Sequence, residues 1–154
     1  MTTFLKNRDM KFSFHLLLAC IALTACGESG KTTADYRIVP CPGEIAPGDG
    51  GDFELDARTR IICTGDNDGM RANAEFLAGY VESVVGSAPE ITGPDGLCDD
   101  GRAVILRADA PGKGGEAYEI EVSGNRITVS GESDAGVFYG IQTLRKAMGA
   151  AKAA

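Results

Sequence analysis

A β-hairpin predicted at residues 116–130 constrains the fold more than any other feature of the sequence. Residues 116–122 and 126–130 alternate apolar and polar side chains, as strands with one buried face do. Gly124-Asn125 separates the two stretches and accepts the positive φ angles of a tight turn. The apolar face of the hairpin collects Tyr118, Ile120, Val122, Ile127 and Val129. Such a hairpin needs a second layer of structure to cover that face.

Two segments with helical periodicity can provide this layer. The first helix is predicted to begin at Asp68 and to end at Gly86, and the second has Asp134 as its predicted N-cap. Their apolar stripes are formed by Met70, Ala74, Leu77, Val81, Val84 and Val85 in the first helix, and by Val137, Ile141, Leu144 and Met148, with Phe138 beside them, in the second.

Short apolar runs predict further strands at residues 36–39, 52–55, 60–63 and 102–107, with another around Ile91. The unbroken apolar middle of residues 102–107 indicates a central strand that is buried on both faces. The order of elements is therefore strands, helix, strands, hairpin and helix. This order predicts an α+β domain of two layers, in which a mixed β-sheet has two helices packed on one face.

The N-terminal residues 1–25 have the pattern of an export signal, with a basic start and an apolar stretch too short to span a bilayer. The segment ends in Leu-Thr-Ala before Cys26, which resembles the lipobox of bacterial lipoproteins. We expect Cys26 to be lipidated and to anchor the chain to a membrane of the bacterial cell envelope, on its periplasmic or outer-membrane side. An ordinary cleaved signal is the alternative. Residues 26–35 are expected to be a flexible tether, residues 36–148 the folded domain, and residues 149–154 a tail.

The composition of the chain then disfavours several classes of function. The 154-residue chain has a formal net charge of −7, and its Lys and Arg residues are not clustered, which disfavours nucleic-acid binding. Its one histidine, His15, leaves with the signal, so no imidazole remains for a nucleophile pair or a zinc site. Residues 25–32 resemble a phosphate-binding loop, but they lack the flanking strand and helix and cleavage falls inside them. We therefore expect no nucleotide, cofactor or metal, and we interpret Glu119 and Glu121 as solvent-facing.

Three cysteines, Cys41, Cys63 and Cys98, remain in a compartment that permits disulfides. No Cys-x-x-Cys spacing is present, so a metal knuckle is not predicted. A bridge between Cys63 and Cys98 is one prediction, because both lie at the ends of core segments. Three buried, reduced thiols are the alternative.

The hairpin and the last helix also carry a recognisable motif. Residues 116–120 read Glu-Ala-Tyr-Glu-Ile, residues 127–129 read Ile-Thr-Val, and residues 136–144 read Gly-Val-Phe-Tyr-Gly-Ile-Gln-Thr-Leu. This pattern resembles the small domain that precedes the barrel in family 20 glycoside hydrolases, the β-N-acetylhexosaminidases. The matching motif positions are Glu116, Tyr118, Gly136, Tyr139, Gly140, Gln142, Thr143 and Leu144.

The resemblance implies a parent enzyme that removes terminal β-linked N-acetylhexosamine by substrate-assisted retention. It also implies an adjacent Asp-Glu catalytic pair in a (β/α)₈ barrel. No Asp-Glu dipeptide occurs in residues 1–154, and 154 residues are too few for such a barrel. We therefore assign no catalytic residue, and we expect a truncated chain that lacks the barrel and is inactive alone. Gly140 inside a helix marks a close contact, either with the sheet of this domain or with the barrel.

Two other functions remain open at this point. The chain could be a free-standing lipoprotein module that binds glycans or another partner, but glycan stacking needs an exposed aromatic platform. The sequence has no Trp, and Tyr80, Tyr118 and Tyr139 are predicted on or beside core faces. It could instead precede the barrel of another carbohydrate-active enzyme, which the run Gly-Ile-Gln-Thr-Leu at residues 140–144 disfavours.

Overall fold

The computed structural model describes residues 42–46, 48, 50–97, 101–110 and 114–149. The chain divides into two compact units, residues 1–31 and 32–154, and all described residues belong to the second. The export signal, Cys26, the tether, the predicted strand at residues 36–39, Cys41, Cys98 and residues 150–154 lie outside the described residues. No helix among the described residues is both long and apolar enough to cross a membrane.

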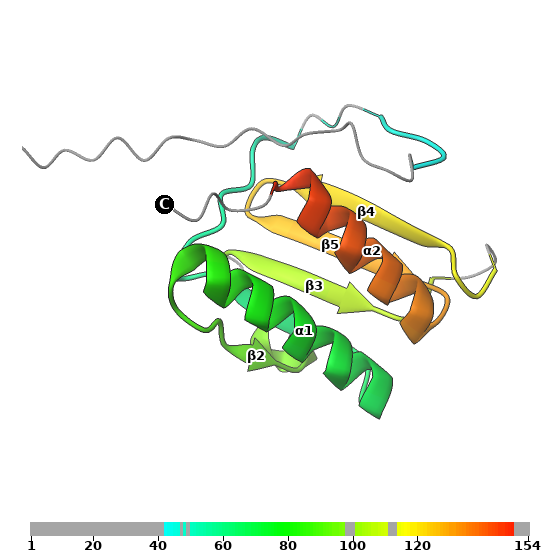
Figure 1. Ribbon diagram of the computed structural model, residues 1–154, viewed down its shortest axis with the longest axis horizontal. Coiled ribbons are helices and arrows are strands. Elements are labelled where there is room, and N and C mark those ends of the chain that lie inside the picture. The colour runs from blue at the N-terminus through cyan, green and yellow to red at the C-terminus, as the bar shows by residue number, and fades with distance from the viewer. Residues whose placement is uncertain (1–41, 47, 49, 98–100, 111–113, 150–154) are drawn as a thin grey trace, which may run out of the picture. The chain divides into compact units, whose positions relative to one another are not determined.

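Five strands form one mixed sheet in the order β2-β1-β3-β5-β4 (Figure 1). The strands are β1 (Arg60–Cys63), β2 (Ile91–Thr92), β3 (Ala103–Arg107), β4 (Tyr118–Ser123) and β5 (Arg126–Gly131). The first four in spatial order are parallel, and β4 pairs antiparallel with β5, with Ile120 opposite Val129. The predicted hairpin is thus confirmed, and its turn contains Gly124 at a φ of 55°.

Two helices, α1 (Asp68–Val85) and α2 (Asp134–Ala147), lie side by side on one face of the sheet (Figure 1). Asn67 caps α1 by accepting a hydrogen bond from the Met70 amide, and Gly86 ends this helix in the left-handed conformation, as predicted. The cap of α2 is Ser133, whose hydroxyl accepts from the Gly136 amide. The prediction of Asp134 as N-cap was therefore wrong by one residue. Asp134 lies in the first turn, where its negative charge suits the helix dipole.

The predicted α+β class with two layers is confirmed, and the main core lies between the sheet and the helices. Side chains that alternate along the strands meet the predicted helix stripes there. The most buried members are Ile61, Val104, Leu106 and Val129 from the strands, with Met70, Leu77, Val81, Val137 and Ile141 from the helices. Val84 is the exception, since it is exposed near the end of α1.

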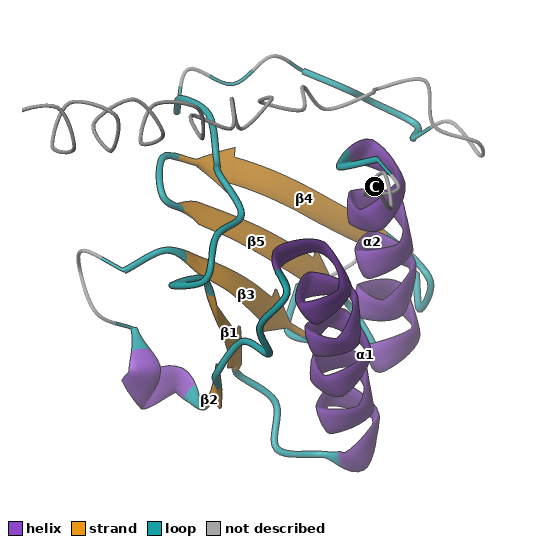
Figure 2. Cartoon of the chain, turned by 60° about the vertical axis from the view of Figure 1, so that its left-hand side comes forward, coloured by secondary structure: helices purple, strands orange, loops and turns teal. Residues whose placement is uncertain are grey.

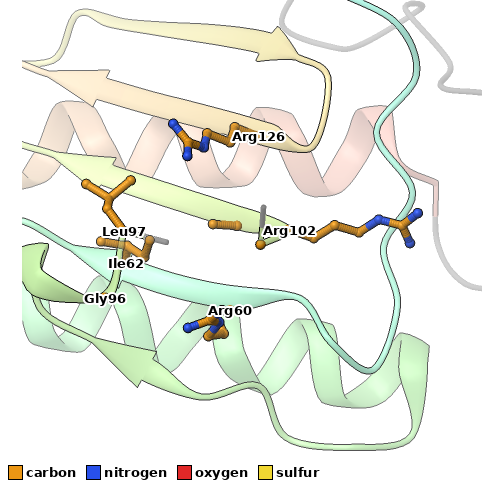
Figure 3. Close-up of a pocket in the computed structure, with 8 residues that line it drawn as sticks. Arg60, Ile62, Gly96, Leu97, Arg102 and Arg126 are labelled. Atoms are coloured by element: carbon orange, nitrogen blue, oxygen red, sulfur yellow. The ribbon is translucent and has the colours of Figure 1, made fainter. Parts of the chain in front are cut away.

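The opposite face of the sheet is covered differently. Ile62, Ala103 and Ile105 form a small second cluster there, which confirms that β3 is buried on both faces. The connection between β2 and β3, which contains the short 3₁₀-helix η1 (Pro94–Gly96), passes over this face (Figure 2). Leu97 follows η1 and lies beside Ile62, in a hollow that Arg60 and Arg126 also line (Figure 3). A loop, rather than a helix, thus shields this smaller apolar cluster.

Two further predictions were wrong. Residues 52–55 do not form a strand, and their alternation arises because Phe53 and Leu55 pack from a loop onto the main core. Cys63 is a free, buried thiol and not half of a bridge to Cys98. Its sulfur points into the helix-facing core, 3.3 Å from the carbonyl oxygen of Gly65 and 3.7 Å from that of Met70.

The loop before β1 is organised by Asp56. Its carboxylate accepts from the Arg58 amide, the Arg58 guanidinium and Arg102, whose Nη1 lies 2.5 Å from Oδ2. Burial acts to raise the pKa of Asp56, but these hydrogen bonds and the charges of Arg58 and Arg102 outweigh it, so the pKa lies below its ordinary value of 3.8. The folded state therefore favours the ionised carboxylate.

This loop predicts an acid-dependent loss of stability. A carboxyl group whose pKa is lowered by folding contributes stability above its unfolded pKa, and this contribution is lost as the pH falls through the folded pKa. We expect Asp56→Asn to lower the free energy of unfolding by about 1 kcal/mol at pH 7. The difference from wild type should shrink as the pH falls below 3.8. Urea unfolding at several pH values measures it. Asp109→Asn, at an ion pair with half-exposed partners, is the control and should change less.

Candidate interaction surface

The motif residues of the sequence meet where β4 and α2 pack together. The hydroxyl groups of Tyr118 and Thr143 lie 2.7 Å apart and share a hydrogen bond, which joins the edge strand of the sheet to the middle of α2. Both side chains are half-buried, so the bond is partly shielded from water. Tyr118 therefore contributes its ring to the core side of the hairpin and its hydroxyl to the helix.

Two glycines allow α2 to approach the hairpin closely. A Cβ atom at Gly140 would lie 2.5 Å from Val129 Cγ1 and 3.4 Å from the Tyr118 ring, and a Cβ atom at Gly136 would collide with the carbonyl oxygen of Ala117. Gly140 thus packs against the sheet of its own domain, which is the first of the two contacts that the sequence allowed. These motif positions serve the internal packing of the domain.

The outward side of the helices carries an aromatic surface, which we define as Phe76, Tyr80, Phe138, Tyr139 and Arg145. Phe76 of α1 and Phe138 of α2 meet with ring centroids 5.5 Å apart, and Phe138 lies 5.9 Å from Tyr139. Phe76, Phe138 and Tyr139 are 38%, 36% and 43% exposed, although they are large apolar residues. Contiguous exposed aromatic side chains of this kind mark interaction surfaces.

Arg145 lies within this aromatic surface and stacks on two rings. Its guanidinium carbon is 4.8 Å from the Phe76 centroid and 5.0 Å from the Tyr80 centroid. The Tyr80 hydroxyl donates to the carbonyl oxygen of Gly149 at 2.9 Å, which fixes the end of α2 against α1. Burial raises the pKa of Tyr80 above its ordinary value, and the Arg145 charge offsets part of this shift. The cation and its two rings are thus held in place by both helices.

The aromatic surface does not form a flat platform for a sugar ring. The Phe76 and Phe138 rings are inclined at 46°, and the Phe138 and Tyr139 rings at 64°. Edge and tilted contacts suit packing against a contoured protein surface, whereas a sugar stacks on the face of one ring. The two hollows on the other face of the sheet have no aromatic side chain in their linings. The geometry therefore favours a protein partner over a glycan.

The structure brings some motif residues together and separates others. Tyr118, Gly140 and Thr143 are in contact, and Leu144 is buried in the main core. Gln142 accepts a hydrogen bond from Arg145, which connects the motif to the aromatic surface. Glu116 is exposed and no described contact gives it a role.

The described residues include no group of three or more His, Cys, Asp or Glu side chains placed to hold a metal ion.

The aromatic surface was not predicted from the sequence. Tyr139 was predicted on or beside a core face, which was wrong, and Phe138 was predicted only as a neighbour of the apolar stripe. Phe76 was not considered at all. A usable signal existed, because Phe76 and Phe138 both lie off their helices' buried stripes, and large aromatic residues outside a stripe have to face solvent or a partner.

The Tyr118 hydroxyl provides a test of the internal packing. Tyr118→Phe removes one partner of the hydrogen bond and leaves the Thr143 hydroxyl half-buried, so we expect a loss of about 1 kcal/mol in the free energy of unfolding. Thr143→Val should cost a similar amount. The double variant should cost less than the sum of the two, because both changes remove the same bond. Urea unfolding of the four proteins measures this coupling, and full additivity would contradict it.

Comparison with known proteins agrees with the motif. A family model described as glycosyl hydrolase family 20, domain 2, matches residues 35–154. A search of curated proteins found no match. Among solved structures, the GH20 β-N-acetylhexosaminidase from Streptomyces coelicolor is 26% identical with a TM-score of 0.61, and the match covers 73% of this chain. The N-acetyl-β-hexosaminidase of Streptomyces plicatus, in complex with thio-NAglucal, gives the same values. The chain spans 21% of the length of either enzyme.

A structure of the protein CpGH84D shares the fold at 17% identity and a TM-score of 0.53.

Proposed function

Because the chain belongs to glycosyl hydrolase family 20, with residues 35–154 matching domain 2 of that family, we propose that it forms the non-catalytic accessory domain of a β-N-acetylhexosaminidase. The aromatic surface across α1 and α2 packs against the catalytic barrel of that enzyme and stabilises it. The observation that carries this proposal is the exposure of Phe76, Phe138 and Tyr139 next to motif residues that are themselves used for internal packing.

The energetics favour such a supporting role. Aromatic and Arg side chains are enriched at the centres of protein interfaces, where their burial contributes most of the binding energy. The aromatic surface presents both kinds of residue on two helices that are fixed to each other, so little side-chain freedom remains to be lost on packing. A barrel that covers this surface gains a rigid neighbour without any change in the domain itself.

The reaction of the proposed parent enzyme is the removal of terminal β-linked N-acetylhexosamine from glycans. The acetamido oxygen of the substrate serves as the nucleophile, and an Asp-Glu pair of the barrel supports it. Residues 1–154 contain no Asp-Glu dipeptide, and Glu119 and Glu121 project from the exposed face of the edge strand β4. We therefore propose that the domain takes no part in bond cleavage.

We further propose that the domain works at the bacterial cell envelope, anchored through a lipid on Cys26. The support is the sequence pattern of residues 1–26. Metabolic labelling with a palmitate analogue tests it: wild type should be labelled in the membrane fraction, and Cys26→Ser should not. Label retained by Cys26→Ser would overturn the anchor.

The enzymatic proposal is tested first with the purified chain. A chromogenic N-acetyl-β-glucosaminide should give no turnover above the blank. Turnover that a single substitution within residues 42–149 abolishes would overturn the non-catalytic role. Binding on a glycan array at micromolar strength would support the free-standing glycan-binding module instead.

The supporting role is tested in a graft. Residues 35–149 replace the matching segment of the Streptomyces coelicolor enzyme, and the melting temperature of its catalytic domain is compared with that of the enzyme without any such segment. The graft should melt at the higher temperature. Phe138→Ser in the graft should remove much of this gain, whereas Ile91→Ser, at a residue 42% exposed on the edge strand β2, should not. Equal melting with and without the graft would contradict a supporting role.

A further inference from the structure

Arg145 differs from four other arginines of the described chain in the groups that its charge contacts. Arg58, Arg71, Arg102 and Arg107 each form an ion pair with an Asp or Glu side chain. Within the described part of the chain, no carboxylate pairs with Arg145, and its one hydrogen bond donates from Nη1 to the neutral Gln142 amide oxygen. The charge of Arg145 is therefore stabilised by the faces of two aromatic rings and by the carbonyl end of α2, and not by a carboxylate.

The same side chain is also short of hydrogen bonds. Its Nε atom is buried and has no hydrogen-bond partner, and stacking on Phe76 and Tyr80 restricts access of water to the guanidinium faces. A guanidinium carries five N–H donors in a fixed, planar arrangement that matches the two oxygens of a carboxylate. A cation in this state gains more from an incoming carboxylate than a solvated surface arginine does.

We infer that Arg145 is the anchor of the aromatic surface and pairs with one Asp or Glu side chain on the catalytic domain that packs against it. This inference rests on the proposed function and adds the chemistry of the partner, an apolar surface that presents a single carboxylate. The Phe76 ring contacts both Arg145 and Phe138, so it lies beside the pair and shields it from water. Gln142 holds the guanidinium in position, because its amide oxygen accepts from Nη1 at 3.1 Å.

The test uses the graft into the Streptomyces coelicolor enzyme. Arg145→Met keeps the apolar stem on the two rings but removes the charge, and it should lower the melting temperature of the grafted enzyme by roughly 4 °C. Arg145→Lys keeps the charge without the planar donors and should fall between Met and wild type. Arg71→Met, at an exposed arginine near the start of α1, is the matched control and should leave the melting temperature unchanged.

Arg145 also packs inside the domain, so a second measurement separates this role from partner binding. The 154-residue chain with Arg145→Met is melted alone, and the shift in the graft should be larger than the shift in the chain by itself. Each surface Asp and Glu of the catalytic domain is then replaced by its amide. In the graft that carries one of these replacements, Arg145→Met should hardly change the melting temperature, as expected when two changes remove one interaction.

The outcomes distinguish the inference from the proposed function. A graft destabilised by Phe138→Ser, but no more affected by Arg145→Met than the chain alone, would overturn the carboxylate pair and leave the supporting role intact. A graft without any gain in melting temperature would overturn both. Self-association of the 154-residue chain in sedimentation velocity, abolished by Arg145→Met, would show that a second copy occupies the surface and would also overturn the inference.

Discussion

Gly140→Ala is expected to destabilise the domain by about 2 kcal/mol, although alanine is the better helix former. The added Cβ atom would lie 2.5 Å from Cγ1 of Val129, which is fully buried and β-branched and so has little freedom to turn aside. The strand or the helix has to shift to relieve the overlap, and this shift disturbs the contact with Tyr118. Urea unfolding followed by circular dichroism measures the change.

Gly79 provides a matched control for this substitution. It also lies in the interior of a helix, α1, but a Cβ atom there would meet no atom within 4 Å. Gly79→Ala should therefore stabilise the domain by roughly 1 kcal/mol through helix propensity alone. The two substitutions are expected to have opposite signs. Equal effects would show that Gly140 is not required for the close approach of α2.

Leu106→Ala should have the largest effect, a loss of about 3 kcal/mol in the free energy of unfolding. Leu106 is fully buried in the central strand β3, in one cluster with residues of both helices, and a densely packed core relaxes only partly into the cavity that alanine leaves. The same urea unfolding experiment measures the loss.

Ile105 is the adjacent control on the same strand. Its side chain lies on the other face of the sheet, in the small cluster beneath Leu97 and the loop that contains η1. A loop can move into the vacated space more readily than a helix, so Ile105→Ala should cost about half as much as Leu106→Ala. A cost equal to that of Leu106→Ala would contradict the difference in cover between the two faces of the sheet.

Much of the fold could be predicted from the sequence because its strongest elements have strict periodicity. The hairpin alternates with a period of two around Gly124-Asn125, and both helices carry apolar stripes, so their faces were fixed before any packing was known. The unbroken run at residues 102–107 similarly indicated the central strand. Alternation over only four residues was not enough, since residues 52–55 alternate because two side chains reach the core from a loop.

The interaction surface could not be predicted in the same way. Periodicity shows which residues of one helix face the core, but it does not show which exposed residues of two helices come together. Phe76 and Phe138 are 62 positions apart in the sequence, and only the parallel packing of α1 and α2 brings their rings into contact. The lack of an ion pair between Arg145 and any described carboxylate is likewise a property of the tertiary structure, and the residues next to Arg145 in the sequence do not predict it.

By itself, the sequence determined the class of the domain, the core faces of its main elements and its membership of family 20, because periodicity and the motif at residues 136–144 are local properties. Only the tertiary structure decided that Gly140 serves internal packing, that Cys63 stays a thiol, and that three aromatic rings and one cation share an exposed surface. Those features depend on distances between elements far apart in the chain, and such distances are set when the helices pack on the sheet.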